Sequence, residues 1–298
     1  MIYTVTLNPS LDYVAFCDTF NFGKTNRTNN EYVVPGGKGL NISILLSRLG
    51  DDTCALGFTG GFTGKELTRL LNKEGINCDF QDVAQSTRIN IKLSCNKITE
   101  FNASGITLDN NKINALKEKL KTLKSGDWLC LSGSIPKGAD ISIYHDLALC
   151  VPQGVKVVID AVGKPLIEAL KVKPFLIKPN IDELCDIFEC EIKTQEEIIF
   201  YAKKLKDMGA QNVLVSLGED GALLLDDTGK IHTTKPPKGK AVNTVAAGDS
   251  MIAGFIHQFI KTNDYADSLK FATASGSATA FSPWIAKPEL IEQLYKTL

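Results

Sequence analysis

The residues with the clearest chemical potential lie near the C-terminal end of the sequence, in Asn243-Thr-Val-Ala-Ala-Gly-Asp249-Ser-Met. Small side chains there allow backbone N–H groups to converge at the start of the apolar, helix-like run that follows. The N-terminus of a helix favours an anion. Asp249 places a carboxylate at the rim of this positive site. A carboxylate repels phosphate, so its position suggests a base directed at a hydroxyl that receives a phosphoryl group.

A second candidate motif is Pro35-Gly-Gly-Lys-Gly-Leu-Asn41, which precedes a helix-compatible stretch from about Leu40 to Leu49. Gly36 and Gly37 permit close approach of the backbone, and Lys38 supplies a positive charge. This arrangement suits a polyol or phosphate ligand lying on the turn. A glycine-rich turn before a helix is also common as plain structure, so the motif alone leaves both interpretations open.

Polar residues also follow predicted strands, at the edge of a parallel sheet where ligands bind. Asp12, in Asn8-Pro-Ser-Leu-Asp12, is placed to accept hydrogen bonds from sugar hydroxyls, or it is a solvent-facing turn residue. Lys178-Pro-Asn180-Ile-Asp-Glu183 follows another strand. Asn180 and Glu183 are one helical turn apart and could orient a hydrated magnesium ion, although an ordinary acidic first turn fits equally well.

Two further glycine-rich segments read mainly as turns. Ser216-Leu-Gly218-Glu-Asp-Gly221 follows a strand and precedes another at Ala222-Leu-Leu-Leu, and beside a nucleotide site it would shape the adenosine pocket. Thr59-Gly-Gly-Phe-Thr-Gly-Lys65-Glu66 resembles a Walker A motif, which needs Gly in place of Thr59 and Ser or Thr in place of Glu66. We therefore interpret it as a turn before a helix.

The elements that would position these residues alternate between apolar strands and amphipathic helices. Strands are predicted at 128–132, 155–160, 175–178 and 212–216, and helices at 111–123, 141–150 and 195–208, the last ending at Gly209. This alternation indicates an α/β fold with a mostly parallel central sheet covered on both faces. Residues 11–17, 31–35 and 89–101 instead alternate apolar and polar side chains. We interpret them as a small antiparallel sheet with one face in water, a candidate lid, within a single domain spanning residues 1–298.

Composition limits the classes of partner and compartment. The chain has 298 residues, is 44% hydrophobic and has a formal net charge of −1, which gives no general attraction to nucleic acid or to an anionic membrane. No secretory signal or membrane-spanning run is evident, so we expect a soluble cytoplasmic protein. The eight cysteines lack CxxC spacing and are expected to be reduced, mostly buried thiols. The three histidines are isolated and are not expected to bind a metal.

Taken together, these segments resemble the ribokinase-like PfkB family of carbohydrate kinases, from Thr4 to about Phe281. Two signatures carry the resemblance, Gly36-Gly-Lys-Gly-Leu-Asn41 and Ala247-Gly248-Asp249-Ser250. The sequence is most similar to the branch of 1-phosphofructokinases and tagatose-6-phosphate kinases. That closer similarity depends on Asn8-Pro-Ser-Leu-Asp12, Thr25-Asn-Arg27, residues 57–64, Thr87-Arg-Ile-Asn-Ile-Lys92 and Leu131-Ser-Gly-Ser-Ile-Pro136.

The resemblance implies a three-layer α/β/α domain with a β-sheet lid that often forms a homodimer contact. It also implies a role for each matching residue. Asp249 would be the base, and the backbone amides of Ala246, Ala247 and Gly248 would form the anion hole. The sugar phosphate would be bound by Asp12, Gly36, Gly37, Lys38, Asn41, Arg27 and, at its phosphate, Arg88. ATP would be bordered by Lys178, Asn180, Ser216, Gly218, Gly221 and Gly248, with Mg²⁺ held through water by Asn180 and Glu183.

The implied activity is ATP-dependent phosphorylation of a sugar phosphate, with fructose 1-phosphate ahead of tagatose 6-phosphate and fructose 6-phosphate. A kinase of an unphosphorylated sugar or nucleoside and a non-catalytic sugar-phosphate sensor remain as alternatives. One residue departs from the family pattern, because Ala246 stands where the family usually has Gly. If this position requires a positive φ, the Ala is strained by roughly 1 kcal/mol or more.

Overall fold

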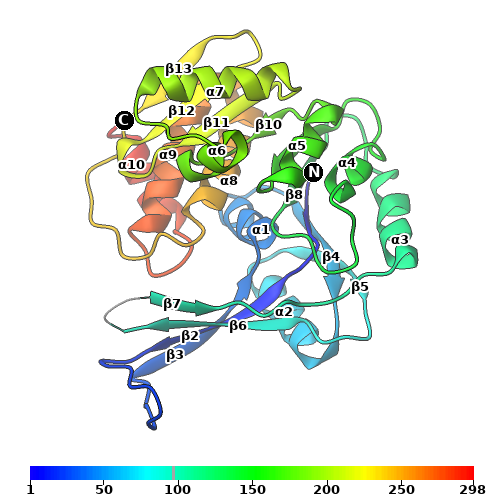
Figure 1. The fold of residues 1–298 in the computed structure, drawn as a ribbon, viewed down its shortest axis with the longest axis vertical. Helices are drawn as coiled ribbons and strands as arrows, with labels where there is room; N and C mark the ends of the chain where they lie inside the picture. Colours follow the sequence, from blue (N-terminus) through cyan, green and yellow to red (C-terminus); the bar gives the residue numbers. More distant parts are fainter. Residues whose placement is uncertain (96–97) are drawn as a thin grey trace.

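The computed structural model describes residues 1–95 and 98–298, whose strands form one large and one small sheet (Figure 1). The large sheet has the order β13-β12-β11-β10-β9-β8-β1-β4-β5. Its strands are β1 (Ile2–Thr6), β4 (Thr53–Thr59), β5 (Asn77–Asp82), β8 (Trp128–Ser132), β9 (Lys156–Asp160), β10 (Leu176–Ile177), β11 (Asn212–Ser216), β12 (Ala222–Leu225) and β13 (Ile231–Thr234). All neighbouring strands from β5 to β11 in this order pair in parallel. At the other edge, β12 pairs antiparallel with both β11 and β13. All four strands predicted in this part of the chain are confirmed.

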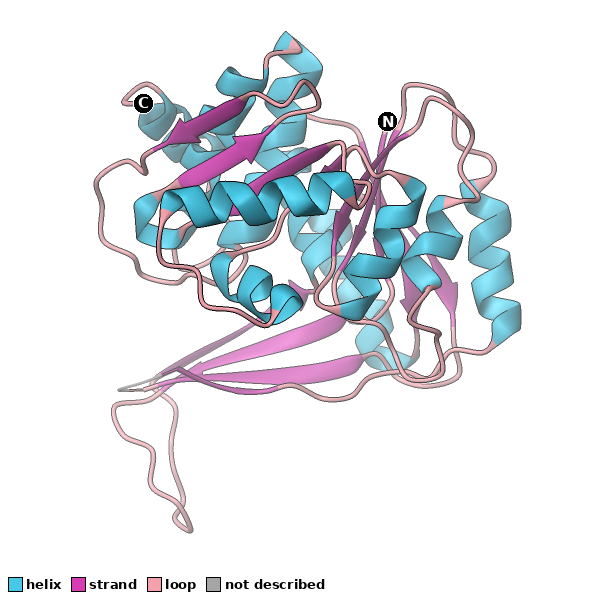
Figure 2. Cartoon of the chain, turned by 45° about the horizontal axis from the view of Figure 1, so that its top comes forward, coloured by secondary structure: helices cyan, strands magenta, loops and turns pink. Residues whose placement is uncertain are grey.

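Helices cover both faces of this sheet (Figure 2). Each face has its own apolar core. One face carries α1 (Lys38–Arg48), α2 (Gly61–Lys73), α8 (Ala247–Thr262), α9 (Tyr265–Ala280) and α10 (Pro288–Tyr295). The other carries α3 (Asn110–Leu120), α4 (Ile143–Ala148), α5 (Lys164–Ala169), α6 (Ile181–Phe188) and α7 (Gln195–Asp207). The predicted three-layer α/β/α architecture is confirmed. The glycine-rich segment Thr59–Glu66, expected as a turn before a helix, turns only at Thr59 and Gly60: Thr59 ends β4 and Gly60 is the N-cap of α2. Its remaining residues form the first turns of α2.

The small sheet, which we call the lid, consists of β2 (Ser10–Phe16), β3 (Asn30–Gly36), β6 (Arg88–Ser94) and β7 (Ile98–Phe101), in the order β3-β2-β6-β7. It projects from one edge of the main body (Figure 1). The expectation that it is wholly antiparallel is wrong, because β2 and β6 pair in parallel. The chain between them passes through β3, α1, β4, α2 and β5 instead of turning back as a hairpin. The predicted strand at 89–101 is two strands, and residues 96–97 within it lie outside the described residues.

The two faces of the lid differ in polarity, but the polar face is not the one exposed to solvent, as had been expected. Its polar side chains, among them Asp12, Asn90 and Lys92, line a cavity. Several of the alternate positions are apolar and exposed: Tyr13, Val33, Ile89, Ile91 and Phe101 are 36–55% exposed, while Leu11 and Ala15 are buried. The alternation was read correctly, but the polar face lines the cavity and the outer face leaves apolar side chains uncovered.

Two cysteines differ from the expectation of reduced, buried thiols. Cys17 and Cys95 form a disulfide. Phe16 pairs with Ser94 in the β2–β6 register, so the next residue of each strand meets the other at the end of the lid. The remaining six cysteines are free, as expected, but only Cys130 among them is buried, so the expectation that most are buried is wrong. No helix among the described residues has the length and apolarity needed to cross a membrane.

Candidate active site

A cavity of about 720 Å³ lies between the lid and the ends of the main-sheet strands. Most of the predicted site residues line it: Asp12, Gly37, Lys38, Asn41, Arg88, Lys178, Asn180, Glu183, Ser216, Ala246, Gly248 and Asp249. Five predicted residues are not part of its lining: Arg27, Gly36, Ala247, Gly218 and Gly221. Elements that are far apart in sequence therefore converge on one cavity.

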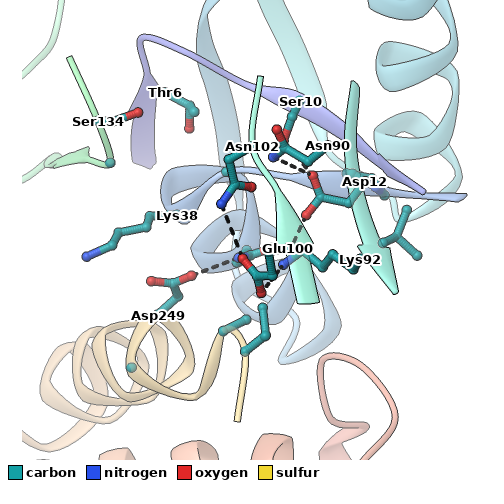
Figure 3. A pocket seen from close by; sticks show the side chains of 18 of the residues that line it. Thr6, Ser10, Asp12, Lys38, Asn90, Lys92, Glu100, Asn102, Ser134 and Asp249 are labelled. Carbon is teal, nitrogen blue, oxygen red and sulfur yellow. Dashed lines mark hydrogen bonds and ion pairs between the residues drawn. The ribbon is translucent and has the colours of Figure 1, made fainter. Parts of the chain in front are cut away.

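Asp249 connects the two signature motifs directly (Figure 3). It lies in the first turn of α8, is only 6% exposed, and its Oδ2 accepts a 2.7 Å hydrogen bond from Nδ2 of Asn41. Burial, followed by the negative charge of Asp160, raises the pKa of Asp249 from 3.8 to about 6, against the opposing effects of Lys38, Asn41 and Lys178. A carboxylate with a pKa near the working pH is suited to general-base chemistry.

Asp160 organises the cations of the site, and sequence reasoning missed it. This residue ends β9 and is fully buried. Its Oδ2 lies 3.0 Å from Nζ of Lys38, and its Oδ1 lies 3.7 Å from Nζ of Lys178. Burial alone would raise the pKa of Asp160, but the two lysines outweigh it and lower that pKa. The available signal was a carboxylate at the carboxyl end of a buried parallel strand.

The pKa of Lys38 shifts in the opposite direction. Burial alone would lower it, but Asp160, Asp249 and Glu183 outweigh that effect and raise the pKa. The ammonium group of Lys38 is therefore charged at any pH at which the protein functions, and it lies beside the predicted base.

The start of α8 borders the cavity, where an anion-binding site was predicted from the sequence. Ala246 is the N-cap and has φ 64°, so this position is left-handed and the expected strain at Ala246 is present. Nζ of Lys178 passes so close to Gly248 that a Cβ there would lie 2.9 Å from it. Gly248 therefore allows a second cation to reach the N-terminus of the helix. Among the three predicted anion-hole amides, that of Ala247 already donates a hydrogen bond, to the carbonyl of Thr244 at 3.3 Å.

Asn180 and Glu183 form a capping box at the start of α6, the structural alternative left open above. Glu183 N donates to Asn180 Oδ1 at 2.7 Å, and Asn180 N donates to Glu183 Oε2 at 2.9 Å. The other oxygen of Glu183, Oε1, lies 4.0 Å from Lys38 Nζ. The two residues still line the cavity, and each retains acceptor capacity beyond the cap.

The turn after β11 was also expected to border the cavity. Ser216 does so, while Gly218 and Gly221 adopt positive φ in the adjoining turn outside the lining. The backbone N–H of Ser216 donates to the carbonyl of Pro179, which joins this turn to the Lys178–Glu183 segment. The two predicted nucleotide-binding segments are therefore neighbours.

On the lid side, Asp12 is held by hydrogen bonds from its own sheet. Its Oδ1 accepts from Ser10 Oγ at 2.6 Å and from Asn90 Nδ2 at 3.0 Å. Gly36 lies against these groups, where any Cβ would collide with Asp12. Gly36 is therefore needed for close packing beneath the cavity wall and does not itself line the cavity.

The two predicted substrate-binding arginines are placed differently. Arg88 lines the cavity, and its guanidinium donates to the carbonyls of Asn8 and Ala103 at 2.9–3.2 Å. Arg27 is exposed in the loop between β2 and β3. This loop extends beyond the far end of the lid (dark blue in Figure 1). The structure does not bring Arg27 to the cavity of its own chain.

Comparison with known proteins agrees with this geometry. Residues 6–286 match the model of the pfkB family of carbohydrate kinases. The chain belongs to this family. This pfkB kinase is therefore an enzyme that transfers a phosphoryl group from ATP to an alcohol.

Relatives of this pfkB kinase cover nearly its whole length. It is 42% identical to 1-phosphofructokinase of Bacillus subtilis, over 99% of this chain and 97% of the relative. It is 38% identical to D-tagatose-1-phosphate kinase of Bacillus licheniformis, over 98% and 97%. Among solved structures, phosphofructokinase-2 from Escherichia coli superposes with a TM-score of 0.94 at 28% identity, covering 100% and 99% of the two chains.

Proposed function

We propose that the protein is a 1-phosphofructokinase, which transfers the γ-phosphoryl group of ATP to fructose 1-phosphate and releases ADP and fructose 1,6-bisphosphate. The observation that carries this proposal is the 2.7 Å contact between Asp249 and Asn41, which places a buried carboxylate of raised pKa in the glycine-rich motif's cavity. Similarity to named 1-phosphofructokinases over nearly the full length supports the choice of acceptor.

In this proposal Asp249 takes the proton from the attacking hydroxyl. Phosphoryl transfer proceeds mainly through positioning and neutralisation of charge on the moving group. The N-terminus of α8, with the amides of Ala246 and Gly248, and the ammonium groups of Lys38 and Lys178 provide that positive environment. The amide of Ala247, also predicted for this role, would have to give up its bond to Thr244 to take part. Asp160 fixes both lysines without entering the reaction.

ATP would lie along the Lys178–Glu183 segment and the turn of Ser216, Gly218 and Gly221. Mg²⁺, when bound, neutralises the phosphates during transfer. Asn180 and Glu183 would contact it through water, because Oδ1 of Asn180 and Oε2 of Glu183 already accept hydrogen bonds in the capping box. Among the described residues no group of three His, Cys, Asp or Glu side chains forms a metal cage. This fits an ion held largely by phosphates and water.

The acceptor would lie between α1 and the lid. Gly37, Lys38, Asn41 and Asp12 would contact its hydroxyls, and Arg88 its phosphate. Arg88 uses three N–H groups on backbone carbonyls, and a guanidinium has five, so donors remain for an anion.

We also propose that the lid mediates a homodimer. The exposed apolar side chains on its outer face, including Val33, Ile91 and Phe101, would be covered by the same face of a second copy. Arg27 lies at the end of the lid and would then reach the partner's cavity instead of its own. A structure of Escherichia coli phosphofructokinase-2 is described as a tetrameric inhibited form, which supports association in this family. We place the enzyme in the cytoplasm, because it consumes ATP.

D-tagatose 1-phosphate is the second candidate acceptor, favoured by the 38% identity to a D-tagatose-1-phosphate kinase. A panel of ATP-consumption assays separates the candidates, using fructose 1-phosphate, tagatose 1-phosphate, tagatose 6-phosphate, fructose 6-phosphate and the free sugars. We expect the highest kcat/KM with fructose 1-phosphate. A higher value with a free sugar would contradict the proposal, and binding without ATP consumption would indicate a sensor.

A further inference from the structure

An ion triad lies on the cavity face of the lid, and only one of its members has been given a role above. Nζ of Lys92 lies 3.3 Å from Oδ2 of Asp12 and 3.6 Å from Oε1 of Glu100. All three residues line the cavity (Figure 3). The side chain of Lys92 is 16% exposed, so its ammonium group is partly removed from water between the two carboxylates.

The strand register fixes this arrangement. Lys92 pairs directly with Glu100 across β6 and β7. It pairs with Val14 across β2 and β6, and Asp12 is two residues from Val14 on the same face. Directly and diagonally opposed side chains on one face of a sheet interact. The backbone therefore brings one cation between two anions in the cavity wall.

The hydrogen bonds of Asp12 occupy one of its carboxylate oxygens and leave the other to Lys92. Ser10 and Asn90 both donate to Oδ1 of Asp12. Its other oxygen, Oδ2, has the ammonium of Lys92 as its described partner. Lys92 therefore sets the orientation of the oxygen that is available to a ligand.

We propose that Lys92 is a positioning residue for the acceptor, which holds Asp12 and Glu100 as a wall that accepts hydrogen bonds from sugar hydroxyls. The triad carries one net negative charge, so this wall repels phosphate. Arg88 begins the same strand, roughly 13 Å away along the backbone, and faces the same cavity. The phosphate of the acceptor lies toward Arg88 and its hydroxyls lie against the wall. This inference depends on the proposed sugar-phosphate acceptor.

Removal of the cation provides the first test. In Lys92→Met the two carboxylates face each other without a counter-ion, so they repel and turn apart. We expect KM for fructose 1-phosphate to rise about tenfold, as for loss of a charge-assisted contact, while KM for ATP stays unchanged and kcat changes less than threefold. Adding Glu100→Gln removes the repulsion and should recover a large part of the lost affinity. Lys92→Gln is carried in parallel, so that the test does not depend on one variant folding.

Two outcomes would overturn the inference. If Lys92 bound the substrate phosphate directly, Glu100→Gln would not rescue Lys92→Met, and inhibition by inorganic phosphate would weaken in Lys92→Met. We expect that inhibition to weaken only in Arg88→Ala. Lys121→Met is the matched control, because Lys121 forms an exposed ion pair with Glu118 on the surface of the protein. Failure of the unmodified enzyme to bind or phosphorylate any ketohexose phosphate would instead refute the proposed function.

Discussion

Replacement of Asp249 by Asn should lower kcat strongly and at the same time stabilise the fold at neutral pH. The structure holds a carboxylate in a buried position, where its pKa rises from 3.8 to about 6. Asn removes the charge, and its amide oxygen can still accept the hydrogen bond from Asn41. A shift of this size corresponds to about 3 kcal/mol of lost stability in the ionised form, at 1.36 kcal/mol per pKa unit.

The pH dependence of this gain has a definite sign. The folded-state pKa of Asp249 lies above its unfolded value, so ionisation costs more in the folded protein. The unmodified protein therefore loses stability as pH rises from about 4 to about 6, and the loss is constant above that range. The Asn variant does not undergo this change. The difference in free energy of unfolding should be near zero at pH 4 and approach ~3 kcal/mol at pH 7, or about 5 °C in Tm for a chain of this size.

Differential scanning calorimetry from pH 4 to pH 7, together with kcat measured at pH 7, tests both halves of the prediction. Loss of a general base lowers kcat by about 10²- to 10⁴-fold. Asp160→Asn is the matched control with the opposite sign, because the folded-state pKa of Asp160 is lowered and its charge stabilises the fold above the unfolded pKa. An Asp249→Asn variant that is less stable than the unmodified protein at pH 7, or a stability difference independent of pH, would refute the reasoning.

Three further predictions concern neighbouring features. The fall of kcat/KM at acidic pH should have an apparent pKa near 6, from Asp249. Asp160→Asn should lower this apparent pKa, because a negative charge that raises the pKa of Asp249 is lost. A higher apparent pKa in this variant would contradict the prediction. Ala246→Gly should raise the free energy of unfolding by about 1 kcal/mol in denaturant titrations, because φ is 64° there; an unchanged midpoint would show that the strain is already relieved. Cys17→Ser should lower the free energy of unfolding by up to about 4 kcal/mol, because the Cys17–Cys95 bond closes a 78-residue separation, and the matched comparison is the unmodified protein under reducing conditions.

Local patterns were sufficient to predict the layers of the fold and the centre of the site. The apolar runs at 128–132 and 212–216 form strands with the predicted ends, because a strand buried on both faces leaves a continuous hydrophobic signal. Asp249 and Asn41 were assigned to one site through two family signatures, and the structure joins them by a hydrogen bond. Such motifs are short and contiguous, so sequence retains them.

Features that depend on pairing between distant strands could not be predicted. The parallel pairing of β2 with β6 brings Cys17 to Cys95, and no spacing rule in the sequence signals it. In the sequence Asp160 is only the last residue of a predicted strand. Its role in holding Lys38 and Lys178 is visible only in the structure, because the two lysines come from other elements. Alternation predicted two different lid faces, but only the closure of the cavity shows that the polar one faces inward.

The start of α8 combines two destabilising features at the place where the reaction is proposed to occur. Ala246 adopts a left-handed conformation, and Asp249 is buried with a raised pKa. Each would be removed by a single substitution if stability alone mattered. Asp160 has the opposite balance, because two lysines keep its buried charge favourable. This contrast separates a carboxylate held ready to accept a proton from one that fixes cations in place. It explains why, of these two carboxylates, only Asp249 should gain stability and lose activity on replacement by Asn.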